Sequence, residues 1–298
     1  LYKVCVFSFS KKPQIQKTNL IVVAILCLVV LFLSFSHLFG NADLYVSDLL
    51  YQKGNSASGQ IVIIEIDEKS LEEFGSNPLD WDRSVYASLL NKLNSEKQKA
   101  AVIGLDVIFA HSENKESDTL LSKAAAKGNA VTAGMYYYGN LLEVKEDGSY
   151  KQIKNTVIDE VMPYDELRKN SSAGIVNLNL DEDGVVRHFL LNYPGKEGKE
   201  ASFAYQITKI YCEEKGRELI LPENNSVYFE YTYPSGAYLE KISLSDVLND
   251  RIPLSHFEGK IVLVGTCVSS VQDEYLTRSQ ETKRCMAWKF TPTATIFC

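Results

Sequence analysis

Short runs of apolar, largely β-branched residues constrain the fold of this 298-residue chain more than any other feature. They are QIVIIEID at 60–67, AAVIGLDVIF at 100–109 and GKIVLVGT at 259–266. Continuous apolar runs of this length, unlike alternating ones, are typical of strands buried on both faces of a parallel sheet. A further strand is expected in NAVTAGMYYY at 129–138.

Helical patterns separate these strands. The segment 81–97 places Val85, Leu89 and Leu93 on one helical face, and SDTLLSKAAAKG at 117–128 reads as a short helix ending in glycine. Strands that alternate with helices in this way indicate a parallel α/β sheet. The sequence therefore predicts an α/β fold with a mostly parallel central sheet and flanking helices.

The middle of the chain has a different pattern. Asp-Gly pairs at 147–148 and 183–184 lie between strand-like segments, which predicts β-hairpin insertions. We find no internal repeat and no low-complexity segment. A single α/β domain over residues 60–280, decorated by these hairpins, fits the pattern best.

An uncharged apolar run, NLIVVAILCLVVLFLSFSHLFG at 19–40, precedes that domain. It is long enough to cross a hydrocarbon core of ~30 Å and longer than the ~7–15-residue apolar core of a cleaved signal peptide. We therefore expect one transmembrane helix, an uncleaved signal anchor; a buried soluble helix is the alternative. Lysines precede the run and aspartates follow it, so the positive-inside rule places 1–18 in the cytoplasm and the rest outside. Residues 41–59 would form a juxtamembrane helix and linker.

Composition excludes several classes of function. The net charge is −7 and no basic aromatic stripe occurs, so no nucleic-acid partner is expected. The chain contains neither a phosphate-binding glycine-rich loop nor a nucleophile elbow, so we expect no enzyme and no cofactor.

Of six cysteines, only Cys212 and Cys267 lie in the patterned domain. One bridge could join them, but two separately buried thiols are favoured.

Three aspartates are candidates for a shared site: Asp67 after the first predicted strand, Asp273 after the last, and Asp106 within the second strand motif, which could join them if its strand ends early. Ligands of open α/β sheets collect beyond the carboxyl ends of the strands, and carboxylates gathered there could hold a divalent cation. The competing interpretation is that they are separate caps and turns. Asp67 or Ser70 could cap the next helix, and Ser70 with Glu73 fits a capping box. The sequence leaves the metal question open.

Two arginines occupy loop positions of interest. Arg83 begins a predicted helix, and Arg187 follows the turn DEDGVV. Such an arginine either pairs with a carboxylate or backbone carbonyls to fix a loop, or binds an anionic ligand through its planar guanidinium. We favour the structural role. The candidate ligand-binding residues are thus Asp67, Arg83, Asp106, Arg187 and Asp273.

The order of five segments resembles the second class of CHASE domain, the extracellular sensing domain associated with bacterial cyclases and histidine kinases. The segments are IVIIEIDEKSLEEFG, WDRSVYASLLNKL, AAVIGLDVIF, GIVNLNLDEDGVVRHF and SLSDVLNDRIPLSHFEGKIVLVG. The positions that match the family pattern are Asp67, Ser70, Arg83, Gly104, Asp106, Asn177, Asp183, Gly184, Arg187, Gly259 and Gly265. The segment NPLDWDR departs from it, because the family commonly has a Trp-Pro-Trp-Pro-like run there.

This resemblance implies the extracytoplasmic sensor module of a bacterial transmembrane receptor, held at the cell membrane by a single span. It implies an unknown extracellular small ligand and a cytoplasmic effector, a cyclase or kinase, that this chain lacks. It carries over no catalytic residues. Homodimerisation is expected only by analogy with signalling receptors. The rival functions are an extracellular metal-dependent hydrolase that uses the three aspartates, and a structural surface module.

The resemblance also bears on the segment 281–298. The family continues with a segment like Gly-Val-Glu-Ile-His-Ala, and residues 285–292 can be encoded by codons that read Tyr-Gly-Val-Glu-Ile-His-Ala when displaced by two bases. We therefore interpret the residues after about Lys283 as out-of-frame translation, from a sequencing error or a genuine frameshift. Ordered structure is expected to end near residue 280.

Overall fold

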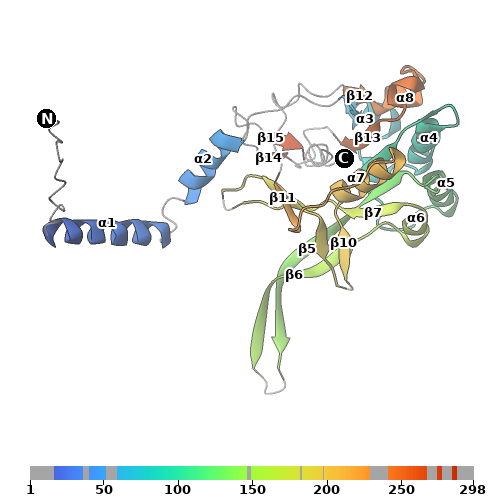
Figure 1. Cartoon of the computed structure of the whole chain (residues 1–298). Coiled ribbons are helices and arrows are strands. Elements are labelled where there is room, and N and C mark those ends of the chain that lie inside the picture. The colour runs from blue at the N-terminus through green and yellow to red at the C-terminus, as the bar shows by residue number, and fades with distance from the viewer. Residues whose placement is uncertain are drawn as a thin grey trace, which may run out of the picture. The chain divides into compact units, whose positions relative to one another are not determined.

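The structure is a computed structural model. It describes residues 17–35, 40–51, 59–145, 149–181, 183–196, 198–228, 241–266, 274–276 and 284–286. The chain divides into two compact units, Leu1–Leu50 and Tyr51–Cys298, which are described separately (Figure 1).

The first unit contains two helices, α1 (Lys17–Phe35) and α2 (Gly40–Tyr51). The sequence predicts one transmembrane helix over 19–40, whereas in the structure α1 ends at Phe35 and α2 begins at Gly40. Among the residues described, no helix combines the length and the apolarity needed to cross a membrane. The predicted span is therefore unsupported. Helix α2 covers the helical part of the predicted 41–59 segment, whose residues 52–58 lie outside the described ranges.

The second unit is built on a mostly parallel sheet, as predicted. Its parallel strands lie in the order β12, β1, β13, β4, β5, β7. Strand β13, the last of these along the chain, lies between β1 and β4, so the three apolar runs that mark the fold are neighbours. The bounds of the six strands are β1 Ile61–Ile66, β4 Val102–Ile108, β5 Ala130–Val144, β7 Ser172–Ile175, β12 Lys241–Ser243 and β13 Ile261–Thr266.

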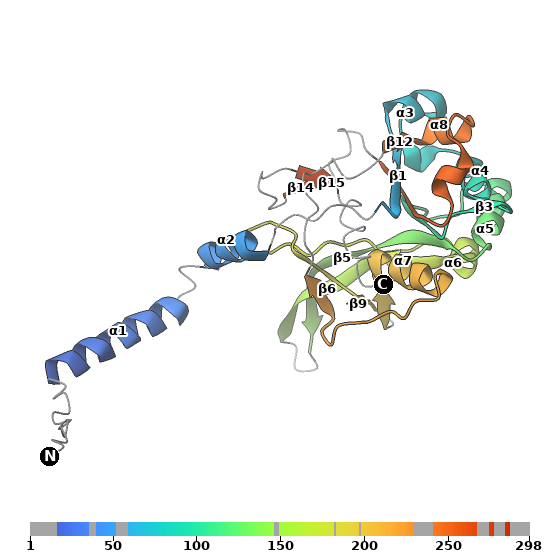
Figure 2. The ribbon, with the colours of Figure 1, turned by 45° about the horizontal axis from the view of Figure 1, so that its top comes forward.

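Helices cover both faces of this sheet, which is why its strands are apolar on both sides (Figure 2). One face packs against α4 and α5 in a core that includes Ile64, Leu90 and Leu105. The other face packs against α7 in a core that includes Ile63 and Phe203. The helices are α3 Glu68–Phe74, α4 Ser84–Leu93, α5 Lys115–Ala125, α6 Asp165–Asn170, α7 Phe203–Glu214 and α8 Leu244–Leu248, with the 3-10 turns η1 Pro78–Asp80 and η2 Leu254–Phe257.

The first predicted hairpin insertion is confirmed, and it is long. Strand β5 continues past the parallel sheet and pairs antiparallel with β6 (Tyr150–Val161) from Met135↔Val161 to Val144↔Tyr150. The two strands extend away from the domain as an arm (Figure 1). The register shifts twice along the arm, and Asn155 has a φ of 50° at the second irregularity.

The second predicted hairpin, around residues 183–184, is much reduced. Residues 172–175 belong to β7 in the central sheet, so only one antiparallel bridge, Asn179↔His188, spans the turn. Small two-stranded sheets follow and precede it: β8 (His188–Leu190) pairs with β11 (Ser226–Tyr228), β9 (Asn192–Pro194) pairs with β10 (Lys199–Ala201), and β2 (Asn94–Ser95) pairs with β3 (Gln98–Lys99).

Two findings concern the C-terminal part. Strand β14 (Glu274–Leu276) pairs antiparallel with β15 (Arg284–Met286), so a regular element occurs beyond residue 280, where the sequence predicts none. Cys212 is disulfide-bonded, which makes the prediction of two separately buried thiols wrong. Cys267 lies outside the described residues.

Candidate functional site

Asp67, at the carboxyl end of β1, is the N-cap of α3. Its carboxylate accepts hydrogen bonds from the backbone N–H of Ser70 (3.0 Å), from the Ser70 hydroxyl (2.6 Å) and from the Ser243 hydroxyl (2.9 Å). Burial alone would raise the pKa of Asp67, but the hydrogen bonds from Ser70 and Ser243 outweigh burial and hold the pKa below its ordinary value. The cap predicted as the alternative to a ligand site is therefore present.

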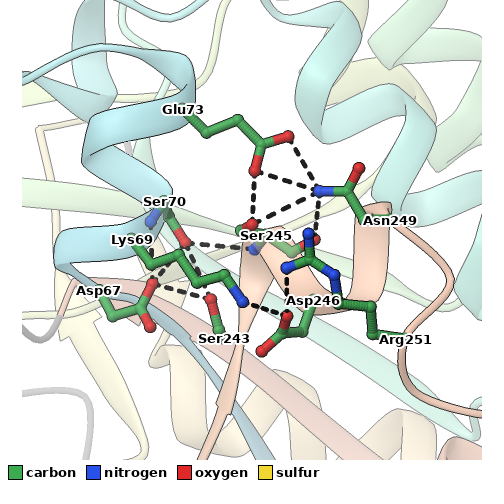
Figure 3. Close-up of polar contacts among 9 residues, drawn as sticks. All are labelled: Asp67, Lys69, Ser70, Glu73, Ser243, Ser245, Asp246, Asn249 and Arg251. Carbon is green, nitrogen blue, oxygen red and sulfur yellow. Dashed lines mark hydrogen bonds and ion pairs between the residues drawn. The ribbon is translucent and has the colours of Figure 1, made fainter.

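The same cluster joins α3 to α8, as Figure 3 shows. Glu73 accepts hydrogen bonds from the Ser245 hydroxyl and from the Asn249 amide (2.9 Å), and these hold its pKa below the ordinary value. Glu73 thus binds α8 and does not complete the capping box predicted with Ser70. We call this set the α3–α8 clasp: Asp67, Lys69, Ser70, Glu73, Ser243, Ser245, Asp246, Asn249 and Arg251.

The outer end of the clasp is charged. Asp246 pairs with Lys69 and with Arg251 (2.8 Å), and these two hydrogen-bonded cations lower the pKa of Asp246. Because the carboxylates of the clasp are engaged by hydroxyls, amides and cations of the clasp itself, its geometry is that of a bridge between two helices.

Arg83, at the N-cap position of α4, is 4% exposed. Its guanidinium pairs with Asp118 of α5, which is 1% exposed, and donates to the backbone carbonyl of His111. It also lies over the ring of Tyr164, 4.7 Å from the centroid. Asp118 accepts further hydrogen bonds from the Ser112 hydroxyl (2.6 Å) and the Glu113 N–H (3.0 Å). Arg83 therefore holds the 111–114 loop, which connects β4 to α5, and this is the structural role that the sequence favours.

Arg187 has the same kind of role at a different turn. It is 4% exposed and donates to Asp181 (2.7 Å) and to both carboxylate oxygens of Asp183 (2.9 and 2.8 Å). Asp183 also accepts from the backbone N–H of Val185, and Gly184 has a φ of 77°, which favours glycine. The guanidinium thus occupies the space between two carboxylates and closes the turn.

Asp106 lies in β4 at the carboxyl half of the sheet and is half-buried. In the register of the sheet it stands opposite Gly265 of β13, which stands opposite Glu65 of β1. Glu65 and Asp106 thus stand on either side of Gly265, on the two strands that neighbour β13. Glu65 is paired with Lys241 (2.9 Å). Asp273 lies outside the described residues.

The structure therefore does not gather the five predicted residues into one described site. Asp67, Arg83 and Arg187 each belong to a separate local network. Within the described side chains, no group of three or more His, Cys, Asp or Glu residues is placed to hold a metal ion. Asp273 is not among these described side chains.

Sequence reasoning missed the partners that define these networks. Asp118 is separated from Arg83 by 35 residues, and Ser243 from Asp67 by 176. The sequence did contain a signal for Ser243. This serine comes directly before a predicted helix, at the position of an N-cap.

Comparison with known proteins places the chain in a family. The CHASE2 domain matches residues 22–285, which is most of the chain. No curated protein and no solved structure matches it. The chain therefore belongs to the CHASE2 domain family, a family of extracellular sensory domains.

Proposed function

We propose that this chain is the extracytoplasmic sensor module of a bacterial transmembrane receptor. The observation that carries the proposal is the family match over residues 22–285. The disulfide at Cys212 supports an extracytoplasmic position, because such bonds persist in oxidising compartments and are rare in the cytosol. The apolar composition of 19–40, preceded by lysines, supports a single-pass membrane tether with residues 1–18 in the cytoplasm.

Within this proposal, a small extracellular ligand binds at the carboxyl edge of the sheet, near Asp106. Open α/β sheets bind ligands at this edge. The α3–α8 clasp and Arg83 then fix the elements that directly follow β1, β12 and β4, so that they position the binding loops. Of the five predicted residues, Asp106 and Asp273 are the proposed ligand contacts.

Signalling requires two arrangements of the domain that bind the ligand with different affinity. The helices that flank the domain would transmit the difference to a cytoplasmic effector, such as a cyclase or a kinase.

The location is tested by fusing alkaline phosphatase to the C-terminus of the full chain in a bacterial host, because this enzyme is active only when exported. High activity is expected, together with low activity when residues 19–40 are deleted. A matched fusion to a protein that fluoresces only in the cytoplasm should give the reverse pattern. A fluorescent, phosphatase-inactive chain would contradict the proposal.

Ligand binding is tested by thermal unfolding of the full chain against amino acids, sugars, nucleotides and divalent cations. A saturable rise in melting temperature for a small molecule is expected, and it should be lost in Asp106→Asn. A rise with divalent cations alone, accompanied by hydrolytic activity lost in the same variant, would favour the metal-dependent hydrolase. No response to any compound would favour a structural surface module.

We also infer that the residues after about Lys283 are out-of-frame. The family match extends to residue 285, which agrees with this interpretation. Resequencing the source DNA from the codon of Gly265 onward tests it: a single-base correction should restore Tyr-Gly-Val-Glu-Ile-His-Ala. If no frame encodes that segment, the interpretation is wrong.

A further inference from the structure

The β5–β6 arm exposes more apolar surface than a solvated hairpin needs. The large apolar side chains with 37–71% exposure on the arm are Tyr137, Tyr138, Leu141, Leu142, Val144, Tyr150 and Ile158. A two-stranded hairpin is at best marginally stable in water without a third strand or a packing partner. The arm therefore has the composition of a surface that is covered in the working protein.

Strand β6 also has an available edge. It pairs with β5 along one side, and within the described residues no other strand pairs with it. Such an edge presents backbone N–H and C=O groups that can pair with another strand. The central irregularity at Asn155, whose N–H donates to the Asn140 side chain (3.2 Å), divides β6 into two halves.

The two halves of β6 carry opposite charge. The half nearer the tip contains Lys151 and Lys154, and the half nearer the domain contains Asp159 and Glu160. All four side chains are exposed. In an antiparallel pair of two identical strands, each basic half lies beside the acidic half of the other copy.

We propose that the partner of the arm is a second copy of this chain, paired antiparallel through β6 about a two-fold axis near Asn155. With the axis at residue 155, Lys151 lies opposite Asp159 of the second copy. The β5 partners of these two residues, Glu143 and Tyr137, are six residues apart, so both side chains lie on the same face of the arm. The result is a continuous four-stranded sheet, β5–β6–β6–β5. A closed two-fold interface of this kind uses the same surface on both copies.

Charge selects this partner over others. Lysines on an exposed edge normally oppose pairing with an arbitrary strand. A parallel pair of two β6 strands would place lysine beside lysine and acid beside acid. Only the antiparallel pair of like copies brings the basic half of each strand beside the acidic half of the other, so the same residues that repel other strands favour the dimer.

The experiment uses charge-swapped variants of the full chain in a mild detergent, with mass measured by light scattering at low salt. The wild type is expected to have twice the protein mass of a single chain. K151E/K154E and D159K/E160K are each expected to have the mass of a single chain, because the two halves of β6 that lie side by side in the dimer then carry charge of the same sign. The swap K151E/K154E/D159K/E160K is expected to restore the dimer.

Mixing provides the sharpest readout. Differently tagged K151E/K154E and D159K/E160K chains are expected to co-purify, although neither associates with itself. K97E/K99E, which changes the charge equally at exposed lysines outside the arm, is the matched control and should remain dimeric. Unchanged circular dichroism in all variants shows that the domain is folded.

Three results would overturn the proposal: a wild type of single-chain mass, a dimer that survives K151E/K154E, or variants that neither pair with each other nor recover in the fourfold swap. A dimer that survives would place the interface elsewhere, for example in the first unit. The proposal stands independently of the sensor role, because these masses are measured without a ligand and do not depend on membrane orientation.

Discussion

The two halves of strand β5 have similar apolar character but opposite surroundings. Residues 130–134 are buried between β4 and β7, whereas residues 137–144 pair with β6 alone and are mostly exposed. Val131 is fully buried, and Leu142, eleven residues further along the same strand, is 68% exposed. An apolar side chain stabilises the fold only when neighbouring strands and helices remove it from water, so the arm contributes little to the stability of a single chain.

This comparison predicts that equivalent changes have large effects in the sheet and its helices and small effects on the arm. All stability measurements below are made at low protein concentration, so that association does not contribute.

The largest effect is expected for Arg83→Met. Removing this guanidinium leaves the Asp118 carboxylate buried without its cation, which should lower the free energy of unfolding by about 3–5 kcal/mol. Urea denaturation followed by circular dichroism measures the change. Adding Asp118→Asn should recover part of the loss, since no unpaired charge then remains. Lys154→Met on the arm is the exposed counterpart and should change stability by less than about 0.5 kcal/mol. Equal effects of the two single variants would contradict the comparison.

A matched leucine pair gives the next largest difference. Leu105, in β4, is fully buried against the α4–α5 side of the core, so Leu105→Ala should cost about 2–5 kcal/mol. Leu142→Ala should stay within about 0.5 kcal/mol. Denaturant midpoints of the two variants check this. A cost above 1 kcal/mol for Leu142→Ala in dilute protein would show that the arm is packed within a single chain.

Two glycines have similarly close neighbours, but the neighbouring side chain is buried at one glycine and exposed at the other. A Cβ on Gly104 would lie 2.7 Å from the Ile207 Cδ1 atom, and one on Gly139 would lie 2.8 Å from the Ile158 Cδ1 atom. Ile207 is fully buried, whereas Ile158 is 44% exposed and can rotate into solvent. Gly104→Ala should therefore cost about 1–3 kcal/mol, and Gly139→Ala less than about 0.5 kcal/mol. Thermal unfolding of both variants measures these costs. Similar shifts in melting temperature would contradict the prediction.

The smallest of these changes in stability is expected at Asp67, the N-cap of α3. Asp67→Ala removes the N-cap of α3 and should cost about 0.5–2 kcal/mol at pH 7. Because the pKa of Asp67 is lowered in the folded state, its contribution is present above the unfolded pKa of about 3.9 and is lost as the pH falls through the folded value. Denaturation at several pH values should thus show the gap between wild type and variant shrinking below about pH 4. A gap independent of pH would contradict this assignment.

The sequence was sufficient for the elements whose signals are local. Continuous apolar runs mark β1, β4 and β13 because a strand covered on both faces is apolar at most of its positions. The Asp-Gly pair at 147–148 predicted the antiparallel pairing of β5 with β6, and Asp67 caps α3 through its own near neighbours. The same local signals predicted the sensory family, which the match over 22–285 shows.

Tertiary structure alone decided the rest. It placed β13 between β1 and β4, paired Arg83 with Asp118 and Asp67 with Ser243, and divided β5 into a buried and an exposed half. These outcomes depend on which distant segments meet. A residue's type and spacing report its own preference for helix, strand or water, whereas its partner is chosen by the packing of the whole sheet.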